Sequence, residues 1–505
     1  MNTAHGNSEI NRLTSPLVRE CEFSADELLG ALLALAPERR VQILDSGGAR
    51  GGADGEARFL IAGFDPFETV EARGDELLIG RRGDAPARVE RGALLSLLDE
   101  RLARYRVAHA PEEASRLPFA GGACIASFSY DLARSFQRLR TIAPQSLAAA
   151  PEPDAVLAFY DTLVIHDYAQ GSTHITTLAG EEQLARTRDA LHEAHTFALR
   201  EVRAFSRFDA EMRNTSERRA SSNFTREEYV AAVSRIKEHI YAGDIYQANL
   251  TQQLTSALAA GDTAERVFLS LRREHPASFA AYLRRREDAV VSASPERFLR
   301  VAWDGREALQ RRVEAWPIKG TRARGATAEE DARLKRELSA SAKDAAENVM
   351  IVDLLRNDLG RVCRYGSVEV AALCEVQEHP TLFHLVSKVR GTLRDGEVTA
   401  GELLRAAFPC GSITGAPKLR AMEIIDETET RRRGLSMGAI GYFSFDGQID
   451  LSVAIRTMTV RDSVARFNVG GGIVAESDPQ AEYEESLTKA RALLRALGAR
   501  VGDVE

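Results

Sequence analysis

Two pairs of acidic residues have the spacing that places side chains on one face of a helix. Asp344 precedes Glu347 by three positions, and Glu482 precedes Glu485 by three. Each pair would therefore present two carboxylates on the same side of its helix. Carboxylates from two such faces, together with water and substrate oxygens, are the ligands that Mg²⁺ prefers. The chain contains 74 acidic residues, and most such pairs form solvated faces, so the spacing alone leaves both interpretations open.

One lysine lies in an irregular segment that could make it a nucleophile. Lys319 stands in "EAWPIKGTRARG", between Pro317 and Gly320. A free lysine, with a pKa of ~10.4, is almost wholly protonated at neutral pH, and only the neutral amine attacks a substrate. Burial or a nearby cation such as Mg²⁺ would lower that pKa. The alternative is an exposed lysine in a basic loop with Arg322 and Arg324, which is the commoner state of a lysine.

Two glycine-rich segments indicate close approach to a ligand. The segment "PCGSITGAPK", residues 409–418, does not fit a phosphate-binding loop, because its glycines are one residue too close and no Ser or Thr follows the lysine. Its glycines more readily shape a loop beside a small ligand. Three consecutive glycines, 470–472, end a β-type run, where backbone amides can approach a ligand closely.

Helices are predicted where capping signals precede an apolar stripe. Ser24 with Glu27, and Thr225 with Glu228, have the spacing of a capping box. The first predicted helix ends at Pro37. A further helix, at 479–497, would carry the second acidic pair.

The strands are short and bounded by turns. Residues 155–165 are β-type, and 438–460 form two β-type arms around Asp446-Gly447, a strong hairpin signal. A third arm follows at 464–474. Strands in such runs, mixed with helices, predict an α+β fold with antiparallel sheet. A polar stretch at 206–222 is predicted as a linker between a β-rich region, 15–205, and a C-terminal domain, 223–498.

Composition excludes several classes of protein. The formal net charge of −8 is spread along the chain and argues against a nucleic-acid-binding face. The five cysteines have no CxxC or zinc-ligand spacing, as expected for free thiols in a reducing compartment. The N-terminus lacks the apolar core of a signal peptide, and no apolar stretch is long enough to span a bilayer. We therefore expect a cytoplasmic protein with neither nucleic acid nor membrane as a partner.

Taken together, segments of 223–498 resemble the chorismate-utilising enzymes, the family of anthranilate, aminodeoxychorismate, isochorismate and salicylate synthases. The matching segments, in the family's order, are "GDIYQANL", "SASPERF", "PIKGT", "AENVMIVDLLRNDLGRV", "HLVS", "GSITGAPK", "AIRT", "GGGIV" and "EYEESLTKA". The resemblance implies two near-orthogonal antiparallel β-sheets forming a sandwich flanked by helices, as in anthranilate synthase component I. It also implies that the C-terminal domain, 223–498, binds chorismate and carries the active site.

The resemblance implies a role for each residue of the active site. Glu347 and Glu485 would hold Mg²⁺, with Asp344 and Glu482 acting through water. Lys319 would be the nucleophile and Glu296 the general acid, and His384 would lie beside the substrate ring. The substrate-binding residues would be Thr321, Thr414, Gly415, Tyr442, Arg456, Gly471, Gly472 and Lys489.

The N-terminal region is similar to the family's tryptophan-binding part. "ILDSGG" would supply Leu44, Asp45 and Ser46 to a tryptophan-like pocket, and "PFAGGACIASFSYDLAR" is similar to the family's glycine-rich strand pair. Tryptophan-regulated anthranilate synthases complete that pocket with a Pro-Tyr-Met segment, whereas this chain has "HPASFAAYL" at 275–283. The departure predicts weak or absent inhibition by tryptophan and leaves a bound structural tryptophan open.

Two positions distinguish the branches of the family. Position 247 is Gln, where isochorismate and salicylate synthases have a lysine that activates water. Position 319 is Lys in "PIKGT", as in aminodeoxychorismate synthases, where anthranilate synthases have Ala. The resemblance therefore favours replacement of the C4 hydroxyl of chorismate by an amine, on the route to 4-aminobenzoate and folate. Anthranilate synthase component I is the alternative.

The expected partner is a separate glutamine amidotransferase subunit that supplies ammonia, since no glutaminase-type cysteine elbow is found in the sequence. A third interpretation, of another class, is a non-catalytic tryptophan-sensing or scaffolding subunit. Lys319, Arg456 and the two acidic pairs argue against it, because a sensor needs none of them.

Overall fold

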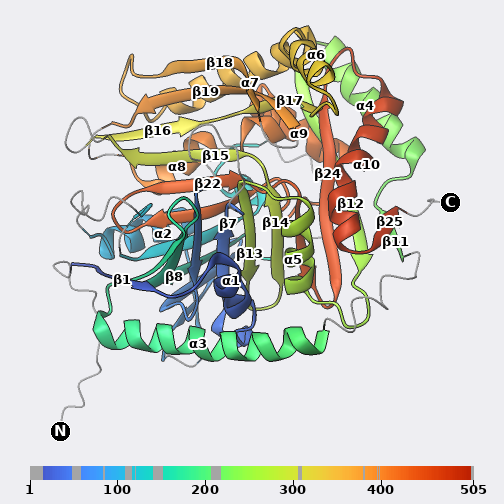
Figure 1. Cartoon of the computed structure of the whole chain (residues 1–505). Helices are drawn as coiled ribbons and strands as arrows, with labels where there is room; N and C mark the ends of the chain where they lie inside the picture. The colour runs from blue at the N-terminus through green and yellow to red at the C-terminus, as the bar shows by residue number, and fades with distance from the viewer. Residues whose placement is uncertain are drawn as a thin grey trace.

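The computed structural model describes residues 15–47, 58–83, 86–107, 117–119, 121–139, 152–205, 218–304, 310–378, 382–394, 396 and 398–501. Within these residues the chain forms two large β-sheets with helices around them (Figure 1). The strands β13, β14 and β24 of one sheet cross the strands β15, β16 and β22 of the other. This arrangement confirms the predicted α+β fold with two largely antiparallel sheets.

The first sheet runs in the order β1 (Leu17–Cys21), β10 (Ser172–Thr177), β9 (Thr162–Asp167), β3 (Phe59–Gly63), β2 (Gln42–Asp45), β13 (Phe279–Arg284), β14 (Ala289–Ser294), β23 (Thr457–Arg461), β24 (Val464–Ile473), β12 (Gln247–Ala257), β11 (Arg218–Ser222) and β25 (Ala499–Val501), with β20 (Gly415–Ala416) paired to β12. The pairing of β11 with β25 is parallel, whereas the other described pairs of this sheet are antiparallel.

The second sheet runs in the order β17 (Ile318–Ala323), β19 (Leu382–Thr392), β16 (Arg311–Ala315), β15 (Arg297–Trp303), β22 (Ile449–Val453), β21 (Ala439–Ser444), β7 (Ala123–Phe128), β8 (Ala155–Tyr160), β4 (Glu68–Arg73), β5 (Glu76–Arg81) and β6 (Arg88–Arg91), with β18 (Glu369–Glu378) paired to β19. A buried apolar cluster joins the two sheets and includes Ile165 and Ala281 from the first and Ile125 and Ile440 from the second.

The helices are α1 (Ala25–Leu33), α2 (Leu94–Arg104), α3 (Gly180–Phe205), α4 (Arg226–Tyr241), α5 (Ala264–Glu274), α6 (Ala328–Ser339), α7 (Ala342–Gly360), α8 (Ala400–Ala407), α9 (Lys418–Thr428) and α10 (Pro479–Ala496), with the 3-10 turns η1 (Pro37–Arg39), η3 (Tyr130–Ser135) and η4 (Gly411–Ile413). Helix α10 packs on β24 and α4, and α7 packs on β17 and β19 (Figure 1). Within the described residues, the apolar length that a membrane-crossing helix needs is not found in any helix.

The predicted helix starts are confirmed. Ser24 and Thr225 cap α1 and α4, and each makes the reciprocal hydrogen bonds of a capping box with the glutamate three residues on. The helix predicted at 479–497 is α10, and the acidic pairs lie on α7 and α10. These elements were predictable because their signals are local.

The predicted hairpin around Asp446-Gly447 forms from β21 and β22, but its second arm is shorter than expected. The arm breaks after Val453, and the chain passes at Arg456, which has φ +49°, into β23 of the other sheet. A hydrogen bond from the Ala293 backbone N–H to the Arg456 carbonyl, at 3.0 Å, fixes this corner. The prediction of one continuous arm was therefore wrong.

Both predicted regions contribute strands to both sheets. The first sheet joins β2 to β13, and the second joins β7 to β21, so each sheet is continuous across the regions 15–205 and 223–498. Of the predicted linker, 206–217 lies outside the described residues. Its last five residues, Arg218–Ser222, form β11 between β12 and β25, so the linker prediction does not hold there.

Candidate active site

A bulge in the second sheet presents the nucleophile predicted from the sequence. In the pairing of β17 with β19, Lys319 stands opposite Leu385 and Thr321 opposite His384, so Gly320 is the extra residue. Gly320 has φ +76°, the left-handed conformation that this kind of bulge requires. The Thr321 hydroxyl and His384 Nδ1 lie 3.0 Å apart, so the two predicted site residues hydrogen-bond each other.

Lys319 lies among the acidic residues that the sequence grouped with it. Its Nζ is 3.8 Å from Glu347 Oε2 on α7, and the two side chains are only 15% and 17% exposed. The charge of Lys319 also acts on Glu485 of α10 and on Glu296. Lys319 is therefore a mostly buried lysine at the meeting point of three carboxyl groups from three parts of the chain, and the exposed-lysine alternative is wrong.

Glu296, in the turn between β14 and β15, has the properties of a general acid. It is 5% exposed, and its Oε1 atom has no hydrogen-bond partner among the described residues. Burial raises the pKa of Glu296 to about 7, although a hydrogen bond from Ser412 and the charge of Lys319 each lower it. At neutral pH a substantial fraction of this carboxyl group therefore carries the proton that an acid catalyst must donate.

The second acidic pair lies on α10, against the glycines of β24. Burial raises the pKa of Glu482, with the charge of Glu485 adding to it against a hydrogen bond from Ser477. Burial would also raise the pKa of Glu485, but its ion pair with Lys489, at 2.8 Å, and the charges of nearby lysines hold it below its usual value. A Cβ at Gly471 would lie 3.2 Å from Glu482 Oε2 and 3.4 Å from Lys489 Nζ, so these groups converge on a glycine face.

The acidic residues have the donor chemistry of a Mg²⁺ site but are held by protein cations. Within the described residues, no group of three or more His, Cys, Asp and Glu side chains forms a metal-binding cluster. Glu347 faces Lys319, Glu485 pairs with Lys489, and Asp344 pairs with Arg322 at 3.2 Å. Carboxylate oxygens, together with water and substrate oxygens, are the ligands that Mg²⁺ prefers. The residues thus fit the ion in type, and its binding remains a prediction.

Arg456 has the surroundings expected of an anion-binding residue. Its backbone is strained at φ +49°. Burial lowers the pKa of its guanidinium, and within the described part of the chain no carboxylate or other side chain pairs with that group. A guanidinium that is desolvated without a protein counter-ion is ready to receive a substrate carboxylate.

The loop 409–418 lies against β12 close to Glu296. Gly415 has φ +149°, and a Cβ there would overlap the carbonyl of Gln247, so glycine is required. Thr414 is fully buried, and its hydroxyl donates to the carbonyls of Cys410 and Gly411 at 3.1 and 3.2 Å. Its side chain therefore stabilises the loop, and its predicted contact with substrate stays a prediction.

Gln247 is a candidate ligand-binding residue that sequence analysis used only to distinguish the branches of the family. Its side chain is fully buried, and both atoms of its amide lack partners among the described residues. A Cβ at Gly472 would overlap this amide, so the glycine keeps space for it. A buried amide without partners costs free energy unless a ligand forms hydrogen bonds with it. The missing partners therefore indicate ligand binding at Gln247, and they can be recognised only in the structure.

Tyr442, which the resemblance assigns to substrate binding, lies in the apolar core of the described structure. Tyr442 packs its ring on Phe119, at 4.9 Å between centroids, within the cluster that joins the sheets, and burial raises the pKa of its hydroxyl. Its described contacts are those of a core residue, and its substrate-binding role stays a prediction.

The tryptophan-like segment is brought beside 275–283, as its resemblance implied. Leu44 and Asp45 pair with Ala281 and Ala280 of β13. Asp45 accepts hydrogen bonds from Arg272 Nε at 2.6 Å and from the Tyr168 hydroxyl at 2.7 Å, so its charge is already neutralised. The hydroxyl of Ser46 is buried and has no partner among the described residues.

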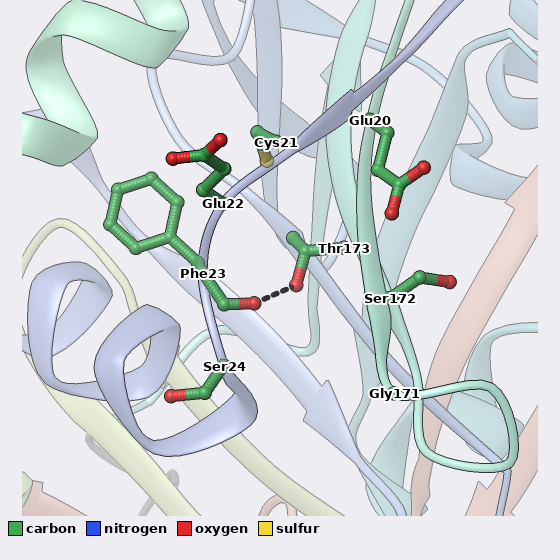
Figure 2. A pocket seen from close by; sticks show the side chains of 8 residues that line it. All are labelled: Glu20, Cys21, Glu22, Phe23, Ser24, Gly171, Ser172 and Thr173. Carbon is green, nitrogen blue, oxygen red and sulfur yellow. Dashed lines mark hydrogen bonds between the residues drawn. The ribbon is translucent and has the colours of Figure 1, made fainter.

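A surface hollow at the far edge of the first sheet is not a candidate for this chemistry. It lies between β1 and β10 and is lined by residues 20–24 and 171–173 (Figure 2). The hydroxyl of Thr173 donates to the Phe23 carbonyl at 2.6 Å across it. The strands β24 and β12, which carry Gly471, Gly472 and Gln247, lie toward the opposite end of the same sheet.

Comparison with known proteins places this chain in one family. The sequence pattern of the chorismate binding enzyme family matches residues 51–495, and the chain belongs to that family. It is 38% identical to aminodeoxychorismate synthase component 1 of Escherichia coli (strain K12), covering 87% of this chain and 90% of the relative. It is 41% identical to the protein of that name from Klebsiella aerogenes, covering 80% and 82%.

A solved structure supports the fold assignment. Anthranilate synthase component I from Streptococcus pneumoniae TIGR4 superimposes with a TM-score of 0.68 at 29% identity, covering 86% of this chain and 92% of that one. The sandwich of two antiparallel sheets is therefore shared with an anthranilate synthase, although the relatives described above have the name of the other branch. The choice between the two activities depends on the site.

Proposed function

We propose that this chain is the large subunit of an aminodeoxychorismate synthase, a transferase that replaces the C4 hydroxyl of chorismate with an amine. The observation that supports it is the mostly buried Lys319, 3.8 Å from Glu347 and electrostatically coupled to Glu296. Burying a lysine costs free energy that a neighbouring carboxylate offsets only in part, and a role in the reaction accounts for its place here. The anthranilate synthase reaction gives no role to a nucleophilic amine at this place.

The first step that we propose is covalent. The neutral amine of Lys319 attacks C2 of the ring, both ring double bonds shift by one position toward C4, and the bond from C4 to oxygen breaks. Glu296, which is protonated, donates its proton to the departing hydroxyl, so that water leaves. One difficult displacement is thereby divided into two easier steps.

Ammonia completes the exchange in the second step. It forms a bond to C4, both double bonds shift back, and the bond from C2 to Lys319 breaks, so that lysine leaves as the neutral amine with which it began. The new ammonium group can return a proton to Glu296. The balance is one chorismate and one ammonia consumed, and one water and one aminodeoxychorismate formed.

Cationic and hydrogen-bond-donating groups bind the negatively charged carboxylates of the substrate. Arg456 and the amides of Gly471 and Gly472 receive carboxylates, with Lys489 nearby, and His384 with Thr321 lines the ring. Glu347 and Glu485 would hold Mg²⁺, assisted by Asp344 and Glu482. When bound, the ion supplies positive charge to a carboxylate of chorismate.

The source of ammonia that we propose is a separate glutamine amidotransferase subunit in the cytoplasm. The relatives are called component 1, which fits a chain that works with another. The product would pass to a separate lyase on the way to 4-aminobenzoate and folate.

The proposed function predicts which nitrogen source the purified chain uses. With chorismate, Mg²⁺ and ammonium at mildly alkaline pH, it should form aminodeoxychorismate, because free NH₃ is then available. With glutamine it should form none until an amidotransferase subunit is added. Chromatography with mass detection measures the product.

The same assay separates the alternatives. Release of pyruvate with a fluorescent aromatic amine would establish the anthranilate synthase reaction instead. Binding of tryptophan without turnover of chorismate would favour the sensing or scaffolding subunit. Turnover of glutamine by the homogeneous chain would contradict the need for a partner.

The metal site gives a second prediction. EDTA should abolish turnover and Mg²⁺ should restore it. Glu485→Gln should remove most activity and weaken Mg²⁺ binding in calorimetry, while circular dichroism stays that of the parent. Glu484→Gln is the matched control, because Glu484 is exposed on the same helix and pairs with Arg226.

If Glu485→Gln binds Mg²⁺ and turns over like the parent, Glu485 is not a ligand. Asp344→Asn should have the milder effect, about 10–100-fold, since a residue that acts through water supports the ion indirectly.

A further inference from the structure

Gly320 allows a close approach between the strand of Lys319 and the helix of Glu347. A Cβ at position 320 would lie 2.8 Å from Asp344 Cγ and 2.9 Å from Leu338 Cδ1. Separations under 3.0 Å essentially never occur for real Cβ atoms. A larger residue would therefore have to displace the side chains of Asp344 on α7 and Leu338 on α6, in addition to straining the backbone at φ +76°.

Asn348 fastens the same helix to the same strands. It follows Glu347 on α7 and is fully buried. Its amide donates to the carbonyls of Pro317, at 3.5 Å, and Leu385, at 3.4 Å, and its oxygen accepts from the Ser387 hydroxyl. Leu385 is the residue paired with Lys319 across β17 and β19.

We infer that Gly320 and Asn348 are positioning residues, which set the place of the Lys319 amine by holding α7 against the bulge of β17. Gly320 determines how closely the helix approaches, and Asn348 determines where along the strands it is fixed. The roles that the family resemblance implies belong to other residues, and neither Gly320 nor Asn348 is among them. The inference deepens the proposed function, because it concerns the same covalent step.

Lys319 has four rotatable bonds, so its amine reaches a defined position only if its surroundings restrict it. The ion pair with Glu347 on α7 provides that restriction. A displacement of about 1 Å in such an arrangement can cost roughly 10²-fold in rate.

The test compares Gly320→Ala with Gly366→Ala. Gly366 also has φ +76°, but a Cβ there would meet nothing within 4 Å, so this control has the same backbone strain without the collision. Each variant is mixed with chorismate without ammonia, quenched with acid and digested. Gly320→Ala should form the adduct on the Lys319 peptide roughly 10²-fold more slowly. Gly366→Ala should match the parent within about twofold, since its site is open.

Two further measurements separate positioning from loss of structure. The dissociation constant for chorismate, measured without Mg²⁺ so that the α7 carboxylates do not contribute, should change less than about threefold in Gly320→Ala, because Arg456 and the β24 glycines are not displaced. Asn348→Leu, which keeps the volume but removes the amide, should show the same division between slow adduct formation and retained binding. Equal adduct rates in parent and Gly320→Ala, or a parallel loss of chorismate binding, would overturn the inference.

Acylation of Lys319 by acetic anhydride gives a readout that does not depend on the proposed reaction. Gly320→Ala should label at Lys319 several-fold faster than the parent, because the amine is no longer held beside Glu347. Gly366→Ala should label as the parent does. A parent that forms no chorismate adduct would contradict the proposed function, and the labelling rates would still decide the positioning role. Unchanged labelling in Gly320→Ala would reject it.

Discussion

Lys319→Ala should form no covalent adduct with chorismate and should lose at least about 10³-fold of aminodeoxychorismate synthesis, in the range expected when a covalent nucleophile is removed. The reason is that alanine cannot attack C2, so the C4 hydroxyl must be displaced in a single step. The measurement is acid quench of enzyme with chorismate in the absence of ammonia, followed by mass spectrometry of the peptide that carries residue 319.

Two further variants test whether the loss of activity in Lys319→Ala is due to removal of a nucleophilic amine. Lys319→Arg keeps a positive charge beside Glu347 but cannot lose its proton at neutral pH, so it should be as inactive as alanine. Lys335→Ala should be fully active, because Lys335 is exposed on α6 and pairs with Glu378. Chorismate should still bind to Lys319→Ala through Arg456. If Lys319→Ala makes aminodeoxychorismate at the parent rate, the covalent mechanism is wrong for this protein.

Glu296→Gln should lower turnover by between about 10² and 10⁴-fold, the range typical of lost general acid catalysis. Glutamine has the same shape but cannot donate a proton to the leaving hydroxyl. In the parent, the pKa of Glu296 near 7 predicts that activity falls as pH rises through about 7 on this limb, because the acid form disappears. The variant should lack that limb. A parent pH profile that rises steadily from pH 6 to 8 at a constant concentration of free NH₃ would contradict the acid role.

The ionisation of Glu296 should also lower the stability of the parent fold, so Glu296→Gln should be more stable at alkaline pH although it is less active. The folded pKa of Glu296 lies above the unfolded value, so the unfolded chain loses its proton first as pH rises. Between pH 4.5 and about 7 this difference in protonation progressively lowers the free energy of unfolding. Above pH 7 the full loss of free energy is present. Glu296→Gln removes the ionisation and should be more stable than the parent at pH 8, by on the order of 1 kcal/mol. Thermal unfolding of both proteins at pH 5 and pH 8 measures this.

Much of the local structure followed from the sequence. The capping boxes of α1 and α4, the tight turn of β21 and β22, and helix α10 depend on residues within a few positions of one another. The acidic pairs on α7 and α10 also follow from helical periodicity. Family resemblance added the roles of Lys319 and Glu296, which local patterns alone left undecided.

The tertiary structure decided how the β-type runs are distributed. Residues 155–165 are one run in the sequence, yet the chain turns at Asp161 and sends β8 and β9 to different sheets. The arm after Asp446-Gly447 divides in the same way at Arg456, between β22 and β23. Strands β8 and β9 are buried throughout, and β22 and β23 are buried except at Asp450 and Arg461. The hydrophobicity of each run is therefore compatible with either sheet and gives no signal for the change.

The sequence by itself determined which residue types were available and which helical faces carried them: a lysine in an irregular turn, two acidic pairs and a run of glycines. Only the tertiary structure decided that Lys319 lies 3.8 Å from Glu347, that Glu296 is buried enough for a pKa of about 7, and that no described carboxylate pairs with Arg456. The reason is that burial and charge depend on residues distant along the chain. Those residues become neighbours only when the two sheets pack, and local propensity contains no information about that packing.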